Sequence, residues 1–265
     1  MRETRGKTMV YTPYDFNESV RHRTEYIEER LRDGSPVAGI SFDGGVLLLT
    51  LRRTQRKIFE IYDRLMFAGL GNQSDLEIIR VGAIDFAHQE GYARSPDDVT
   101  IQRVVGFAIS PGIKRAFGDV LNAPFVVRAL FAEMGRTPEE DLFYTLNYDG
   151  EFVSLNWAAA VAGTPEAEEQ MVRQLVPEDA NGVPDLQTAL RRALRAWAAG
   201  RLWAIDAHLE EEGAESLTDE RIETFLREQL QDLQVEAAIL DRFTKRERKF
   251  RLLKEEEIRP VLPGE

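Results

Sequence analysis

The residues best suited to chemistry are three cations at the start of a predicted strand. Arg53, Arg56 and Lys57 directly precede a short apolar run at residues 58–61. A glycine-rich stretch at residues 69–72 follows the next predicted strand and opens a predicted helix. Cations and the N–H groups of a helix start both attract carboxylates, so the pair suits an anion site. From spacing alone, a solvated charge at a strand edge is the simpler interpretation of Lys57.

Other chemistry-bearing residues show no useful spacing. The histidines, His22, His88 and His208, do not form a metal-binding pattern, and no HExxH, P-loop or EF-hand motif is present. Gly69-Leu70-Gly71 is half of a dinucleotide fingerprint, because no third glycine opens the following helix. The acidic run at residues 210–212 is most simply a solvated surface. We therefore expect neither a metal nor a cofactor.

Composition narrows the class of protein. The 265 residues carry a formal net charge of −12, which argues against a general nucleic-acid binder. Cysteine is absent, so disulfides and thiolate chemistry are excluded. The sequence shows neither a signal-peptide core nor a run of about 18 apolar residues that would span a membrane. We expect a soluble cytoplasmic protein with no nucleic-acid or membrane partner.

The chain begins with an unpatterned segment and then turns helical. We predict a tail over residues 1–14 and one domain over residues 15–262. Asp15 and Glu18 form a capping-box pattern, and Gly34 is a natural helix end. The sequence therefore predicts one helix ahead of the first strand.

The next residues change to the pattern of strands. Asp43-Gly44-Gly45 indicates a tight hairpin between the first two apolar runs. We predict a four-stranded meander from the runs Val37–Phe42, Val46–Leu51, Ile58–Ile61 and Leu65–Leu70.

Helices and strands alternate in blocks along the rest of the chain. Helices are predicted over residues 72–88 and from Asp98, with Pro111 expected to kink or end the second. A later helix pair starts at Pro165 and after Pro184. The remaining predicted strands are Phe125–Phe131, Leu142–Leu146, Glu151–Leu155, Ala158–Ala162, Val235–Leu240 and Lys249–Leu253. This order indicates an α+β fold in which two sheets pack together and helix pairs cover their outer faces.

Several stretches together resemble one known family. Residues 24–71, TEYIEERLRDGSPVAGISFDGGVLLLTLRRTQRKIFEIYDRLMFAGLG, resemble the start of a 20S proteasome alpha subunit. The resemblance continues in DFAHQEGYARSPDDVTIQRV, in LFYTLNYDGEF and in LQVEAAILDRFTKRERKFRLL. It covers about residues 15–203 and 233–262, and its details are closest to the actinobacterial type. An acidic segment with an extra helix, residues 204–231, is longer than in the family.

The resemblance implies a four-layer αββα Ntn-hydrolase sandwich with an N-terminal helix ahead of the first sheet. Active members of that fold use the first residue of a processed chain as nucleophile. Ser35 takes that place here, but Leu51 occupies the position of the supporting carboxylate, and residues 1–34 resemble a helix and tail. We therefore expect no catalytic residue in this chain. The alternative is a self-compartmentalising Ntn peptidase that becomes active after processing to Ser35.

The resemblance also assigns a gate and a docking site. Family members close an axial pore with their N-terminal tails, which implies gate roles for Tyr11, Pro13 and Tyr26. The family's turn proline aligns with residues 16–17 here, so which element moves stays open. Activator C-termini enter pockets between neighbouring subunits, where Lys57 would bind the carboxylate. Backbone N–H groups at Gly71 and Asn72 would complete that site.

The implied partners are proteasome beta subunits, neighbouring alpha subunits in a heptameric ring, and a ring-shaped ATPase or other activator. Catalysis would belong to the threonine nucleophiles of the beta subunits. A third possibility is a structural paralogue that forms rings without gating.

Overall fold

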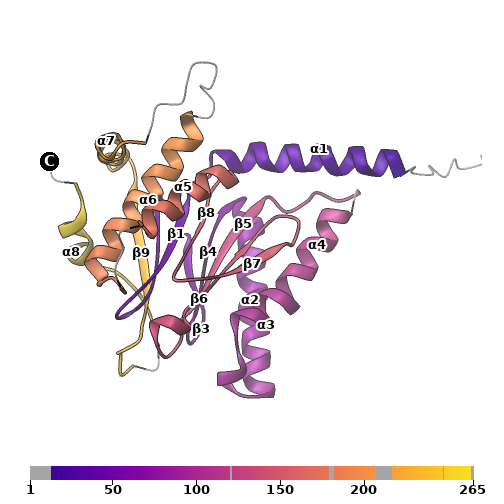
Figure 1. The fold of residues 1–265 in the computed structure, drawn as a ribbon. Helices are drawn as coiled ribbons and strands as arrows, with labels where there is room; N and C mark the ends of the chain where they lie inside the picture. Colours follow the sequence, from indigo (N-terminus) through magenta and orange to yellow (C-terminus); the bar gives the residue numbers. More distant parts are fainter. Residues whose placement is uncertain (1–12, 120, 179–181, 207–216, 247, 264–265) are drawn as a thin grey trace, which may run out of the picture.

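The computed structural model describes residues 13–119, 121–178, 182–206, 217–246 and 248–263, with side chains from residue 17 onward. Within these residues, helices accompany two five-stranded antiparallel sheets (Figure 1). The fold is therefore of the α+β class.

Each sheet combines strands from distant parts of the chain. The first has the order β10-β9-β2-β1-β8 and the second the order β3-β4-β5-β6-β7. The strands of the first sheet are β1 (Val37–Phe42), β2 (Gly45–Arg52), β8 (Ala158–Val161), β9 (Gln234–Asp241) and β10 (Phe250–Leu252). Those of the second are β3 (Ile58–Tyr62), β4 (Leu65–Gly71), β5 (Val127–Glu133), β6 (Leu142–Leu146) and β7 (Phe152–Asn156).

The predicted four-stranded meander is wrong, although its four strands exist. β1 and β2 pair as a hairpin in the first sheet, whereas β3 and β4 pair in the second. The connection at residues 53–57 carries the chain from one sheet to the other. Residues 37–42 of β1 are all buried, because helices pack on one face of this strand and the second sheet on the other.

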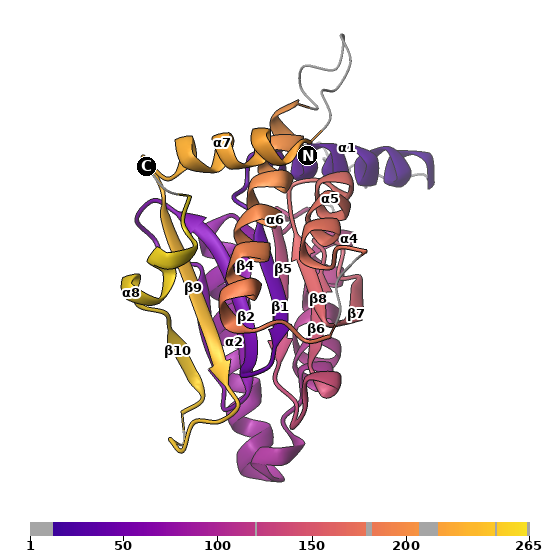
Figure 2. The same cartoon turned by 60° about the vertical axis from the view of Figure 1, so that its left-hand side comes forward.

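The helices cover the outer faces of the two sheets (Figures 1 and 2). On the first sheet lie α5 (Pro165–Leu175), α6 (Leu186–Asp206) and α7 (Asp219–Gln229), with the short α8 (Glu255–Ile258) nearby. On the second lie α2 (Gln73–Ala93), α3 (Ile101–Arg103), the π-helical segment η2 (Val104–Ile109) and α4 (Ser110–Gly118). The 3₁₀ turns are η1 (Pro96–Asp98), η3 (Pro138–Glu140) and η4 (Arg259–Val261).

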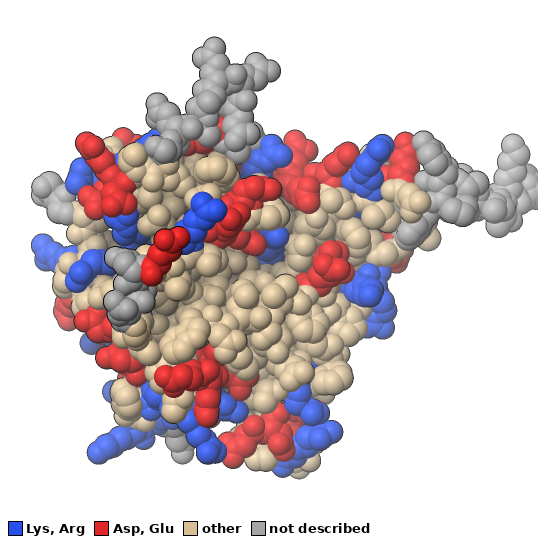
Figure 3. Space-filling model, in the orientation of Figure 1, with Lys and Arg blue, Asp and Glu red and all other residues tan. Residues whose placement is uncertain are grey.

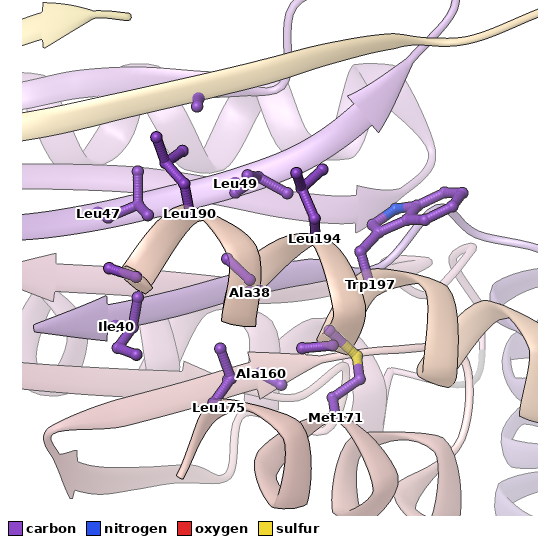
Figure 4. Close-up of a cluster of buried hydrophobic side chains, with 14 of the residues drawn as sticks. Ala38, Ile40, Leu47, Leu49, Ala160, Met171, Leu175, Leu190, Leu194 and Trp197 are labelled. Atoms are coloured by element: carbon purple, nitrogen blue, oxygen red, sulfur yellow. The ribbon is translucent and has the colours of Figure 1, made fainter. Parts of the chain in front are cut away.

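Small side chains let α6 lie close to the first sheet. Leu190, Leu194 and Trp197 project from α6 toward β2 (Figure 4), and alanines separate them along the helix. Met171 on α5 fills the same cluster. A second cluster lies between the sheets and a third between the second sheet and its helices. The predicted helix start at Pro165 is confirmed: α5 begins there, with Thr164 as N-cap.

Helix α1 (Pro13–Arg32) begins two residues earlier than predicted, so Asp15 is not its cap. The predicted tail boundary at residue 14 therefore falls inside the helix. Ile27 and Leu31 are buried in the cluster between the sheets, while the N-terminal part of α1 projects beyond the sheets (Figure 1).

Pro111 neither ends its helix nor removes a needed bond. The chain stays helical from Ile101 to Gly118, and the π-helical segment lies directly before the proline. A π segment shifts the register of backbone hydrogen bonds, and Pro111 then falls in the first turn of α4, where no N–H is required.

Candidate functional site

One candidate site is a cavity of about 490 Å³ where β2 ends and β3 begins. Besides the β2–β3 connection, its walls come from the α1–β1 turn, the first residue of α2, α6, and the end of α7 with the turn that follows it. Its lining residues include Asp33, Ser35, Arg52, Arg53, Lys57, Gln73, Trp197, Arg201, Gln229, Asp232 and Leu233. The cavity therefore has polar walls with an excess of cations, as an anion-binding site requires.

Lys57 is the predicted site residue that this cavity contains. Its side chain is mostly buried, and its ammonium makes no hydrogen bond or ion pair with any residue the structure describes. Burial lowers the pKa of Lys57 to about 8, the Glu236 carboxylate opposes this shift and Arg201 adds to it. At pH 7 the group is still mainly protonated and able to bind a carboxylate.

Glu236 on β9 lies beneath the connection that carries Lys57. Its side chain is 5% exposed, and its carboxylate accepts hydrogen bonds from the backbone N–H groups of Lys57, at 3.0 Å, and Ile58, at 3.1 Å. It also forms an ion pair with Arg52, with 3.1 Å between Nε and Oε2. Glu236 thus ties the first strand of the second sheet to the first sheet.

Ser35 lines the same cavity, but its hydroxyl serves the fold. The indole N–H of Trp197 donates to Ser35 Oγ at 3.0 Å, and Ser35 Oγ donates to the Leu51 carbonyl at 2.6 Å. The Thr50 hydroxyl lies 3.3 Å away and itself donates to the Pro36 carbonyl. These bonds hold the middle of α6 against the turn that precedes β1.

The other predicted docking residues lie in a second hollow. Gly71 and Asn72 share a hollow of about 340 Å³ with Tyr26, Arg30 and Val126. Gln73, the first residue of α2, lines the Lys57 cavity instead. The start of α2 therefore separates the Lys57 cavity from the hollow of Gly71 and Asn72. The structure therefore does not bring Lys57 and the Gly71–Asn72 pair together in one cavity of one chain.

Asn72, at the start of α2, already forms hydrogen bonds within the chain. The Asn72 N–H donates to the Val126 carbonyl at 2.8 Å, and Asn72 Oδ1 accepts from the Ser74 N–H at 3.3 Å. The expectation that Asn72 offers an unused backbone N–H is thus wrong. Gly71 has φ = 126°, and a Cβ there would lie 2.1 Å from the Val126 oxygen. Close packing of β4 against β5 already requires glycine at this position.

The predicted gate residues are placed as follows. Tyr11 lies outside the described residues, and Pro13 is the first residue of α1. Tyr26 is 46% exposed on α1, with the Arg30 guanidinium 5.6 Å from its ring centre. Tyr26 therefore lies on the surface beside the hollow of Gly71 and Asn72.

Sequence reasoning missed the residues that support Lys57. Glu236 had a signal, because it is the one charged side chain inside the apolar run Val235–Leu240. The N–H bond of Trp197 to Ser35 spans 162 positions of sequence. Pairing at such separation leaves no local pattern.

Metal and membrane features give no further site. No group of three or more potential metal ligands occurs among the described residues. None of the helices that the structure describes is long and apolar enough to cross a membrane.

Comparison with known proteins points to one family. The sequence matches no protein-family model. It is 33% identical over 186 residues to the proteasome subunit alpha of Actinosynnema mirum, covering 68% of this chain and 67% of the relative. It is 30% identical over 195 residues to that of Frankia casuarinae, covering 73% and 79%. For that of Geodermatophilus obscurus the identity is 32% over 157 residues, covering 58% and 54%.

Proposed function

Because the chain belongs to the family of proteasome alpha subunits, we propose that it is a non-catalytic subunit of a 20S core particle in the cytoplasm. It forms the outer heptameric ring with copies of itself and stacks on beta subunits, whose threonine nucleophiles cleave the substrate. Two packed sheets with helices outside them support assignment to the αββα Ntn-hydrolase sandwich.

Lys57 is the observation that carries the docking part of this proposal. It is a mostly buried cation without a direct partner among the described residues, in a cavity of about 490 Å³. A C-terminal carboxylate of a ring-shaped ATPase or other activator supplies the missing charge. The family resemblance and the chemistry of the cavity lead to the same residue.

Gly71 and Asn72 belong to this proposal through the ring. A docking pocket between neighbouring subunits is built from two chains, so the Lys57 cavity and the hollow of Gly71, Asn72 and Tyr26 need not come from one copy. In this arrangement Tyr26 lies beside the docked activator tail. Helix α1 connects Tyr26 to the gate. Tyr11 and Pro13 belong to the gate itself, at and before the start of α1.

We do not propose peptidase activity at Ser35. Its amine is part of the peptide bond to Gly34, and its hydroxyl is committed to Trp197 and Leu51. A nucleophile of this class requires a base that is the amine of the same residue.

The proposal is tested by Lys57→Ala in the assembled particle. Removal of the cation is expected to abolish stimulation of peptide hydrolysis by the activator, while native mass spectrometry still detects the ring. Arg56→Ala is the matched control, because Arg56 is an exposed cation of the same connection and does not line the cavity. Stimulation that survives Lys57→Ala would show that the carboxylate binds elsewhere.

A further inference from the structure

Lys57 depends on a residue of the other sheet. The Glu236 carboxylate, on β9 of the first sheet, accepts both N–H groups at the start of β3, those of Lys57 and Ile58. Residues 53–56 before this point are exposed, so these two bonds fix the place where the connection returns to the body of the protein. The position of Lys57 in the cavity is therefore set from β9.

We propose that Glu236 is the positioning residue of the docking site: it anchors the backbone that carries Lys57 and counterbalances the ammonium from beneath the cavity. The expected effect of Glu236 on activator stimulation rests on the proposed docking function. The anchoring and the charge interaction are properties of the chain itself.

The charges around Lys57 show why a carboxylate is needed there. The charged groups that line the cavity with it come from every wall: Asp33, Arg52, Arg53, Arg201 and Asp232. Arg201 is paired with Asp33, with 3.4 Å between Nη1 and Oδ1, and Arg52 is paired with Glu236. Lys57 and Arg52 therefore share one buried negative charge. Removing it leaves two adjacent cations in a poorly solvated place, which disfavours the protonated form of Lys57.

An amide cannot replace this carboxylate. The two carboxylate oxygens accept from two backbone N–H groups and form an ion pair with Arg52. A glutamine has one acceptor oxygen and no charge, and its NH₂ would face another donor. Glu236→Gln removes the charge and half of the anchoring at nearly constant volume. Glu236→Asp keeps the charge on a side chain shorter by one methylene.

The first experiment measures the titration of the Lys57 ammonium in the full chain by ¹⁵N NMR. The chain has only six lysines, and Lys57→Ala assigns the signal. The wild-type midpoint is expected near pH 8. In Glu236→Gln it should fall by about one pH unit, and in Glu236→Asp it should stay nearer the wild type. Arg52→Gln should raise it, because Lys57 then no longer shares the negative charge with another cation.

Glu60→Gln is the matched control. Glu60 is a carboxylate on β3 that pairs with Arg248 and does not line the cavity. Its removal should leave the Lys57 midpoint unchanged. An unchanged midpoint in Glu236→Gln would overturn the proposal. If that variant does not fold, Arg52→Gln decides, and a midpoint that fails to rise there would equally overturn it.

The second experiment follows activator stimulation of the particle against pH. The pH of half-maximal stimulation should move down in Glu236→Gln by as much as the NMR midpoint does, and recover in Glu236→Asp. A loss of stimulation that is equal at all pH values would reduce Glu236 to a structural residue. If the NMR midpoints shift as expected but Lys57→Ala is still stimulated, the docking function is wrong and the positioning of Lys57 stands.

Discussion

The hydroxyl of Ser35 makes hydrogen bonds that serve the fold and not a reaction. Ser35 lines the cavity of Lys57. The family resemblance implies that Ser35 takes the place of the nucleophile of active Ntn hydrolases. Its hydroxyl bonds instead to the indole of Trp197, which is 1% exposed, and to the Leu51 carbonyl. A buried donor and a carbonyl are both satisfied by this one oxygen, so the hydroxyl contributes to stability.

Ser35→Ala should therefore destabilise the chain by about 1–3 kcal/mol, because the Trp197 N–H loses its acceptor inside the fold. Thermal unfolding should report a melting temperature lower by several degrees. Ser154→Ala, at an exposed position of β7, is the control and should leave the melting temperature unchanged. An intact mass that corresponds to a chain starting at Ser35 would contradict this structural role and support the peptidase alternative.

Element by element, apolar patterning predicted the existence of strands better than their partners. β1, β2 and β4 are mostly apolar and buried at nearly every position, because both of their faces are covered. Nothing local in such runs distinguishes a meander from two hairpins in separate sheets. The chain crosses between the sheets at the exposed connection with Arg53 and Arg56, and the charges of this connection do not by themselves indicate a crossing.

Gly71 was predicted to serve the docking site, yet the pairing of β4 with β5 already requires a glycine at this position. An alanine there would place its Cβ 2.1 Å from the Val126 oxygen at a φ of 126°. Gly71→Ala should cost about 2–4 kcal/mol, through strain and the loss of the β4–β5 contact. Gly112→Ala is the matched control in helix α4, where a Cβ meets nothing within 4 Å. It should be neutral or stabilising by up to about 1 kcal/mol.

Urea unfolding of the two glycine variants measures this difference. A normal unfolding midpoint in Gly71→Ala, together with weaker activator stimulation, would mean that the glycine serves the bound tail instead of the fold.

At the scale of the whole molecule, charged side chains are unevenly distributed over the surface. Figure 3 shows few charged side chains on the face over β6, β7 and β8, although the chain carries 46 acidic and 34 basic residues. Edge strand β7 exposes Phe152 and Val153 there. A surface of this kind on an acidic protein suits contact with another protein, which the proposed ring assembly would require.

Helix α1 is fixed to the body of the protein at one end and projects from it at the other (Figure 1). Its C-terminal half is fixed by Ile27 and Leu31 in the core and by Arg23, which donates to backbone carbonyls at the end of α4. Its first residue, Pro13, lies on the part that projects from the body (Figure 1). Pro13 thus marks the end of α1 that lies farther from the sheets, and the proposed gate residue Tyr11 precedes it in the sequence.

Deletion of residues 2–12 should therefore raise the basal peptide hydrolysis of the complete particle without activator, because the pore loses its obstruction. The increase should be larger for a peptide of about ten residues than for a tripeptide, since short peptides are hindered less by a partly closed pore. Hydrolysis is measured on particles whose subunit composition has been checked by native mass spectrometry. The same deletion should remove most of the further gain from an activator, since in the proposed function an activator that docks at Lys57 acts by opening this gate. Unchanged basal hydrolysis of both peptides in a correctly assembled particle would exclude the tail as the gate, and the docking site would then have to act through another element.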